Sequence, residues 1–231
     1  MEKKWVLKQT DEQRATELQE ALRIHPLLCR LLVQRGIQSY EEARDFFRTS
    51  ASHLHDPFRM KGMEASVQRI HQALQAGEKI LVYGDYDVDG TTAVAVVFSF
   101  FQALQAHISY YIPHRFTEGY GLSAKGLSYA IEEGYTLLIT LDCGIKSMAL
   151  IEEGRKAGID TIVCDHHLPD TVLPRAYEIL NPKQADCPYP YKELCGCGIA
   201  YKLISAYRLR YPAACPDVDR FLDLVATAIA A

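Results

Sequence analysis

The sequence predicts an α/β fold: a mostly parallel sheet with helices on both faces, preceded by a short helical N-terminal segment. Two observations predict this class. From about residue 63 onward, short apolar runs alternate with longer stretches of helical periodicity. The apolar runs are continuous, which is typical of strands that are buried on both faces of a parallel sheet. We therefore expect a series of strand–helix–strand units.

The first sixty residues are predicted to be helical. Apolar side chains recur at helical spacing over residues 18–24 and again over residues 27–33. The capping-box sequence Ser39-Tyr40-Glu41-Glu42 opens a third, short amphipathic helix. Residues 53–57 have turn character and mark a boundary. The expected domains are a helical N-terminal segment, 1–60, and an α/β domain, 61–231.

The elements of the α/β domain are bounded by their own sequence signals. Glycines end three of the helices, at Gly77, Gly134 and Gly158, because glycine readily adopts the left-handed conformation that closes a helix. The β-rich runs between the helices are four to six residues long. In chain order we expect helices over residues 63–76, 92–106, 123–133, 146–157 and 199–210, and strands over residues 79–84, 108–112, 136–141, 161–164 and 177–180.

Composition and charge exclude several classes of protein. Of the 231 residues, 48% are hydrophobic and 23% are charged, as in ordinary globular chains. No apolar run approaches the roughly 18 residues of a membrane span. The seven cysteines are irregularly spaced and no export signal precedes them, which favours reduced thiols in the cytoplasm. Because the net charge is −4, a polyanionic substrate would require a local basic patch or metal ions.

Acidic residues directly follow three of the predicted strands. The run Asp85-Tyr86-Asp87-Val88-Asp89-Gly90 follows the first strand, Asp142 the third, and Asp165-His166-His167 the fourth. Ligands of open α/β sheets bind beyond the carboxyl ends of the strands. Five carboxylates that converge there repel one another unless cations neutralise them. Oxygen ligands with a little imidazole suit Mg²⁺ or Mn²⁺, and a pair of such ions supports displacement at phosphorus.

Each acidic motif also has another interpretation. Asp85–Gly90 matches the opening of a calcium-binding loop, but Val96 occupies the position of the required Glu and a strand precedes the loop. The same run resembles the nucleophile loop of haloacid-dehalogenase-type phosphatases. Taken alone, Asp142 is typical of a helix cap or turn, and residues 165–167 of a surface turn. The three placements together favour the metal site.

Two further segments are candidates for phosphate or base binding. The turn Gly196-Cys197-Gly198 precedes a predicted helix, whose first backbone amides can bind phosphate. A plain structural turn explains this sequence equally well. In the loop after the second strand, Arg115 could contact phosphate, and Phe116 or Tyr120 could stack on a base. Local packing of these aromatic side chains is the alternative.

The motifs GDYDVDG, LDCG and DHH, in this order on successive predicted strands, resemble the DHH phosphoesterase superfamily. The segments YIPHRFTEGYGLS, LNPKQ, GCGIAYKL and FLDLVA are similar to its RecJ-type exonucleases, and the likeness covers essentially the whole chain. The resemblance implies a 5′→3′ exonuclease on single-stranded DNA, active in recombination and repair with two Mn²⁺ or Mg²⁺ ions. It also implies single-stranded DNA as the partner, and a single-strand-binding protein or a helicase as candidate protein partners. Because no apolar run is long enough to span a membrane, no membrane partner is expected; the oligomeric state stays open.

The resemblance assigns site residues by position. It implies that His167 meets the scissile phosphate and that Asp142 bridges both ions. The implied metal ligands are Asp85, Asp87, Asp89, Asp142 and His166, the implied catalytic residues are His167 and Asp165, and the implied DNA- or phosphate-binding residues are Arg115, Gly196 and Gly198.

The chain is shorter than RecJ-type proteins, which continue into a second DHH-associated domain and an OB-like fold. Residues 224–231 lack a charged side chain and stop where the family's fourth metal-binding Asp would follow. We therefore expect a fragment of a longer protein, cut before the fourth metal motif and weakly active or inactive by itself. Two other functions stay open: a DHH phosphodiesterase for short oligonucleotides or cyclic dinucleotides, and a non-catalytic DHH-derived DNA-binding module.

Overall fold

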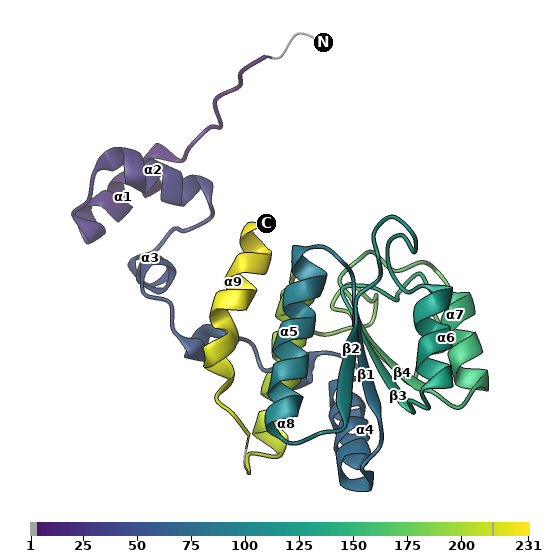
Figure 1. Cartoon of the computed structure of the whole chain (residues 1–231). Coiled ribbons are helices and arrows are strands. Elements are labelled where there is room, and N and C mark those ends of the chain that lie inside the picture. Colours follow the sequence, from purple (N-terminus) through teal and green to yellow (C-terminus); the bar gives the residue numbers. More distant parts are fainter. Residues whose placement is uncertain (1–3, 214) are drawn as a thin grey trace. The chain divides into compact units, whose positions relative to one another are not determined.

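Figure 1 shows the computed structural model of the chain, which describes residues 4–213 and 215–231. The chain divides into two compact units, one ending at Leu54 and the other running from His55 to Ala231. The domain limits expected from the sequence stay a prediction. Among the described residues, no helix combines the length and the apolar character that crossing a membrane requires.

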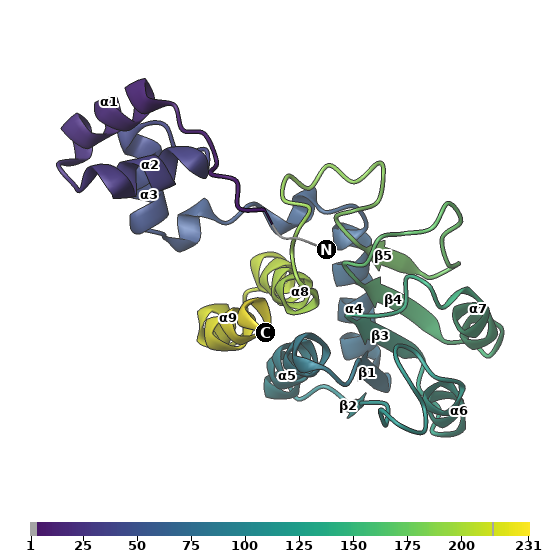
Figure 2. The ribbon, with the colours of Figure 1, turned by 90° about the horizontal axis from the view of Figure 1, so that it is seen from above.

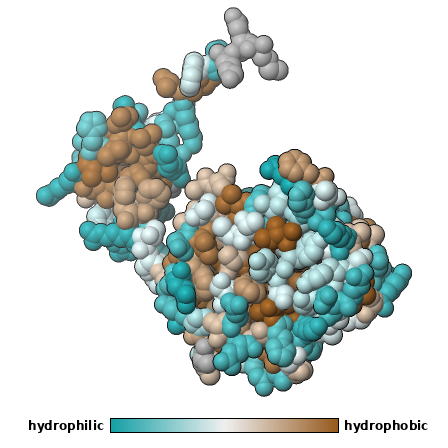
Figure 3. Space-filling model, in the orientation of Figure 1, coloured by the Kyte–Doolittle hydropathy of each residue, from teal (hydrophilic) through white to brown (hydrophobic). Residues whose placement is uncertain are grey.

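The N-terminal unit contains the three predicted helices, α1 (Glu12–Leu22), α2 (Pro26–Gln34) and α3 (Tyr40–Phe47), and a 3-10 turn, η1 (Ala51–His53). The predicted capping box is present at the start of α3, where the Ser39 and Glu42 side chains accept hydrogen bonds from each other's backbone N–H. The core of this unit is small. It contains Leu18, Cys29, Leu32 and Ala43. Figure 3 shows apolar surface gathered on this unit, whose exposed side chains include Leu27, Leu28, Leu31, Phe46 and Phe47.

The second unit is built on a five-stranded, all-parallel sheet, which confirms the predicted fold class. The strand order is β2-β1-β3-β4-β5. Every neighbouring pair is parallel, so all carboxyl ends lie at one edge of the sheet. The strands are β1 (Ile80–Gly84), β2 (Ile108–Tyr111), β3 (Leu137–Leu141), β4 (Asp160–Cys164) and β5 (Glu178–Leu180).

Helices cover both faces of this sheet (Figures 1 and 2). Along β1, Ile80 and Val82 point into one core, and Leu81 and Tyr83 point into the other. The first core lies under α4 (Met63–Ala76), α5 (Val88–Ala103), α8 (Gly196–Arg210) and α9 (Leu222–Ala230), and the second under α6 (Ala124–Glu132) and α7 (Met148–Lys156). The 3-10 turns η2 (Pro57–Arg59) and η3 (Val218–Phe221) complete the unit.

Two helices begin earlier than the sequence predicts. Helix α5 starts at Val88 rather than at residue 92, because the Asp87 carboxylate accepts a hydrogen bond from the Gly90 amide and caps the helix. Helix α8 starts at Gly196 rather than at residue 199, with Cys195 as its cap. Asp89 and the glycine turn at residues 196–198 therefore lie in the first turns of helices, at the carboxyl edge of the sheet.

Candidate metal centre

The site lies where the strand order reverses. Strand β1 has β2 on one side and β3 on the other, and the helices that follow β1 and β3 cover opposite faces of the sheet. Open α/β sheets bind ligands at such a point. Asp85 follows β1, Asp142 follows β3 and Asp165 follows β4, and all three residues are buried at this edge.

Asp85 is buried with one oxygen bonded and one left free. Its Oδ1 accepts a hydrogen bond from the Gly121 amide at 3.0 Å. Its Oδ2 is buried and has no hydrogen-bond partner among the described residues. Burial raises the pKa of the Asp85 carboxyl above its ordinary value, and the Gly121 amide opposes this shift. Asp85 Oδ2 is therefore an oxygen that could bind a cation.

Asp142 is the most strained and most electrostatically perturbed carboxylate of the site. It adopts a left-handed backbone conformation with φ of 59°, which is uncommon for a residue other than glycine and is found mainly where function requires it. Burial raises the pKa of Asp142 to about 6, against the opposing effect of His166. Its Oδ1 has no hydrogen-bond partner among the described residues. His166 thus compensates the charge of Asp142 only in part, and the pKa of the carboxyl stays raised.

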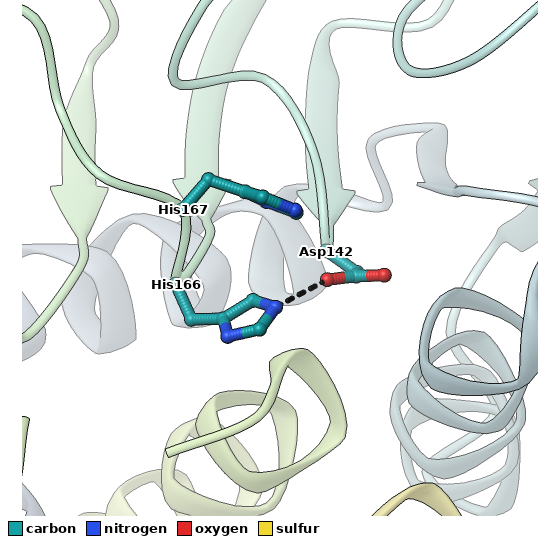
Figure 4. A group of neighbouring side chains, drawn as sticks. All are labelled: Asp142, His166 and His167. Atoms are coloured by element: carbon teal, nitrogen blue, oxygen red, sulfur yellow. Dashed lines mark ion pairs between the residues drawn. The ribbon is translucent and has the colours of Figure 1, made fainter. Parts of the chain in front are cut away.

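His166 and His167 complete a cluster with Asp142. One potential ligand atom from each of the three residues lies within 4.8 Å of the others (Figure 4). His166 Nε2 is 3.0 Å from Asp142 Oδ1, an ion-pair distance without hydrogen-bond alignment, and 3.5 Å from Asp89 Oδ2. The Asp142 carboxylate raises the pKa of His166. The imidazole therefore stands between two carboxylates, as a metal ligand would.

Asp89 joins the first turn of α5 to the start of α8. Its Oδ2 accepts a hydrogen bond from the Gly196 amide at 2.6 Å, and its Oδ1 accepts one from the Cys197 amide at 2.7 Å. A carboxylate at a helix N-terminus is stabilised by these free amides and by the helix dipole. Asp87, by contrast, is exposed and caps its own helix.

The glycine turn is required for close packing against Asp142. A Cβ atom at position 196 would lie 2.6 Å from Asp142 Cβ, so only glycine fits there. The two amides that the sequence made candidates for phosphate binding have partners within the protein: Gly196 donates to Asp89, and Gly198 donates to Cys195 Sγ. Their phosphate-binding role stays a prediction, and it requires these bonds to be exchanged.

Asp165 is buried with both oxygens bonded. Its Oδ2 accepts a hydrogen bond from the Ile145 amide at 2.9 Å, and its Oδ1 accepts bonds from the backbone N–H and from Nδ1 of His167. Burial would raise the pKa of Asp165, but the hydrogen bonds from His167 and Ile145 lower it below its ordinary value. In return, Asp165 raises the pKa of His167. Asp165 therefore orients a histidine and a loop.

The loop after β2 places aromatic and basic side chains near this edge. Arg115 is exposed, and its guanidinium lies 4.9 Å from the ring centroid of Tyr86. Phe116 is 89% exposed, and its ring centroid lies 6.0 Å from that of His114. Sequence reasoning missed two contacts of this loop: the Gly121 amide bonds to Asp85, and the Tyr120 hydroxyl bonds to His167. No local sequence signal could have shown them, because each contact joins segments that are far apart in the chain.

The donor set of this edge fits a divalent cation. Leaving a buried polar atom unsatisfied costs about 1–3 kcal/mol, and here Asp85 and Asp142 each present one such oxygen. Mn²⁺ and Mg²⁺ bind carboxylate oxygens, and imidazole favours Mn²⁺. Among the described residues, Asp142, His166 and His167 have the spacing that a bound ion requires, and Asp85 adds a buried carboxylate oxygen without a hydrogen-bond partner.

The domain is an all-parallel α/β sheet with acidic residues and two histidines at its switch point. Residues 79–229 match the family described as "DHH family, N-terminal domain". The chain belongs to this family, which confirms the resemblance predicted from its motifs.

Relatives of known function are similar over most of the chain. It is 41% identical over 223 residues to the single-stranded-DNA-specific exonuclease RecJ of Bacillus subtilis, an alignment that covers 96% of this chain and 28% of the relative. It is 38% identical over 211 residues to RecJ of Escherichia coli, covering 87% and 36% of the two chains. The chain thus spans about a third of the length of these curated relatives.

Solved structures of RecJ have the same fold. An exonuclease RecJ bound to manganese superimposes with a TM-score of 0.67 at 34% identity, covering 74% of this chain and 43% of the other. RecJ of Thermus thermophilus in complex with Mn²⁺ has a TM-score of 0.75 at 26% identity, covering 93% and 29% of the two chains.

Proposed function

We propose that this chain provides the catalytic DHH domain of an exonuclease that degrades single-stranded DNA from the 5′ end in recombination and repair. The observation that supports this proposal most strongly is the pair of buried carboxylate oxygens on Asp85 and Asp142 that have no hydrogen-bond partner among the described residues, the second of them beside His166. The similar proteins of Bacillus subtilis and Escherichia coli are named as single-stranded-DNA-specific exonucleases. Two solved structures of RecJ proteins contain manganese.

Five side chains would hold two Mn²⁺ or Mg²⁺ ions. Asp142 would be one of these ligands, since its Oδ1 lies 3.0 Å from His166 Nε2, and the resemblance to the DHH superfamily implies the bridging position for it. Asp89 bonds two α8 amides and still has lone pairs for an ion. When bound, the ions stabilise charge on the phosphate and lower the pKa of an attacking water. The proposed ligands are Asp85, Asp87, Asp89, Asp142 and His166.

His167 and Asp165 form the other half of the site. Asp165 accepts the Nδ1 proton of His167, which leaves Nε2 as the nitrogen that can exchange partners. We assign Nε2 to the scissile phosphate. In the doubly protonated ring, Nε2–H would donate a hydrogen bond that stabilises developing negative charge, in place of the bond that Nε2 of the neutral ring accepts from Tyr120. Asp165 acts through His167, because both of its oxygens are bonded within the protein.

Exposed groups beside the site would hold the DNA strand. Arg115 presents a guanidinium to solvent above Tyr86, and guanidinium binds phosphate oxygens in pairs. The exposed ring of Phe116 provides a surface on which a base can stack. Phosphate binding by the Gly196 and Gly198 amides belongs to the same proposal.

We propose the protein partners from the family resemblance, and the cellular location from the cysteines. A single-strand-binding protein or a helicase would supply or expose the DNA. All seven cysteines lie among the described residues and are free thiols there, which favours the reducing cytoplasm.

The experiment uses single strands labelled at the 5′ or the 3′ end, with protein in excess of DNA so that slow cleavage is detected. We expect Mn²⁺-dependent release of the 5′ label as a mononucleotide, and none with EDTA or with Asp142→Asn. Release from the 3′ end, cleavage of dinucleotides alone, or Mn²⁺-independent cleavage would contradict the proposal.

A further inference from the structure

The imidazole of His167 is held at both of its nitrogens. Nδ1 lies 2.7 Å from Asp165 Oδ1, and Nε2 lies 2.9 Å from the Tyr120 hydroxyl. An ionised carboxylate only accepts, so Nδ1 carries the proton and Nε2 of the neutral ring accepts the Tyr120 O–H. The sequence made Tyr120 a candidate for base stacking, yet its hydroxyl has a partner inside the protein.

Hydrogen bonds join the backbone next to Tyr120 to the end of β1. The Gly121 amide donates to Asp85 Oδ1 at 3.0 Å, and its carbonyl accepts the hydroxyl proton of Tyr83 at 2.9 Å. The same Tyr83 oxygen accepts the Ser123 amide at 3.1 Å. Tyr83 is fully buried, so these bonds hold the loop to the sheet itself.

The loop has an internal anchor as well. Glu118 Oε2 accepts bonds from the Tyr111 and Ser123 hydroxyls, both at 2.8 Å, and its Oε1 accepts the His114 amide at 3.0 Å. The Glu118 side chain is only 5% exposed. Gly119, with φ of 80°, makes the turn between this anchor and Tyr120. The position of Tyr120 is therefore set by the protein alone.

Tyr120 is 54% exposed, and its ring also contacts two aromatic neighbours. It meets the rings of Tyr86 and His167 edge to face, with centroids 6.2 and 5.9 Å apart. Phenylalanine at position 120 would keep these ring contacts and lose only the hydroxyl. A connected path thus runs from Asp85 through Gly121 and Tyr120 to His167, and so joins the ends of β1 and β4.

We propose that Tyr120 is a positioning residue, whose hydroxyl fixes the orientation of the His167 ring before substrate binds. The inference rests on the proposed function, since His167 is assigned there to the scissile phosphate. Holding a catalytic group in its reactive orientation lowers the barrier to reaction without tightening substrate binding. The effect of Tyr120 therefore falls on turnover rather than on affinity for DNA.

The first test observes His167 directly in metal-free protein. Nitrogen resonances of the histidine rings are recorded by NMR in EDTA at one fixed pH, and a His167→Gln variant assigns the signals of His167. Tyr120→Phe should shift the Nε2 resonance of His167 and leave the Nδ1 resonance unchanged. The matched control is Tyr110→Phe, because Tyr110 is 56% exposed on β2 and its hydroxyl bonds no described residue. Equal Nε2 shifts in wild type and Tyr120→Phe would overturn the proposal.

The second test measures cleavage of single-stranded DNA with Mn²⁺. Loss of one hydrogen bond corresponds to about a 3- to 10-fold decrease, which we expect in kcat for Tyr120→Phe, with KM within about twofold and Tyr110→Phe unchanged. A decrease confined to KM would show that Tyr120 binds DNA instead, and would overturn the proposal. If wild-type protein cleaves no DNA, the proposed function fails, and the NMR result alone still decides whether Tyr120 orients His167.

Discussion

Asp142 and Asp165 follow the adjacent strands β3 and β4, and each residue is 1% exposed. Burial raises the pKa of Asp142 to about 6, whereas Asp165 has a lowered pKa although burial opposes that shift. The difference arises from hydrogen bonds. Asp165 accepts three of them, two from His167 and one from Ile145, while Asp142 Oδ1 has no such partner among the described residues.

The comparison separates two roles that burial alone could not distinguish. A carboxylate with its hydrogen bonds complete stabilises the folded chain and orients its neighbours. A carboxylate left incomplete at the switch point destabilises the metal-free protein and is ready to bind a cation. We therefore expect changes at Asp142 to remove the chemistry and changes at Asp165 to weaken the framework.

The largest expected effect is on activity at Asp142. Asp142→Asn keeps the shape of the side chain and removes the charge that would bridge two ions, so Mn²⁺-dependent cleavage should fall by about 1000-fold. End-labelled single strands under single-turnover conditions measure this. Near-normal cleavage by the variant would show that Asp142 is not a bridging ligand.

The two histidines should differ in the step that they affect. His167→Ala should lower kcat by about 100-fold with little change in Mn²⁺ affinity, because both ring nitrogens of His167 have hydrogen-bond partners, Asp165 and Tyr120. His166→Ala should weaken Mn²⁺ binding, because His166 lies between Asp142 and Asp89. The kinetics and a Mn²⁺ titration of both variants test this division. Equal loss of metal affinity in the two would refute it.

A smaller effect concerns the stability of the metal-free protein. The raised pKa of Asp142 means that the folded chain binds this proton more tightly than the unfolded chain, so the free energy of unfolding decreases as pH rises from about 4 to about 6. Asp142→Asn should therefore be more stable than wild type at pH 7.5, by up to about 3 kcal/mol, and should lose this advantage below pH 4.

Asp165 should affect the pH dependence of stability in the opposite direction to Asp142. Its lowered pKa contributes stability above about pH 4, and this stability is lost as pH falls. Asp165→Asn should therefore be about 1–3 kcal/mol less stable than wild type at pH 7.5. Denaturant unfolding in EDTA at pH 4 and 7.5 measures both variants. If both substitutions changed the free energy of unfolding at pH 7.5 in the same direction, the proposed difference between Asp142 and Asp165 would be wrong.

Most of the fold could be predicted because its signals are local. Apolar runs and glycine stops locate the strands and most helix ends within a few residues. The starts of α5 and α8 were missed for a physical reason. The Asp87-Val88-Asp89 run has the composition of a loop, and the α8 start is stabilised by Asp89, which lies 107 residues away from Gly196 in the chain.

The acidic residues that gather at the carboxyl edge of the sheet could be predicted, and their hydrogen bonds could not. Acidic residues at strand ends identify Asp85, Asp142 and Asp165 as neighbours once the sheet is parallel. Which of them is satisfied depends on amides and rings brought in by folding, such as Gly121, 36 residues from Asp85. The Tyr120–His167 contact spans 47 residues in the same way.

The central claim is that Asp142 is a metal ligand and that Asp165 is not. Calorimetric titration of Mn²⁺ into wild type, Asp142→Asn and Asp165→Asn tests this claim most directly. We expect Asp142→Asn to lose at least about 100-fold in affinity, and Asp165→Asn to stay within about 10-fold of wild type. Mn²⁺ affinity that survives in Asp142→Asn, or that falls as far in Asp165→Asn, would contradict the account.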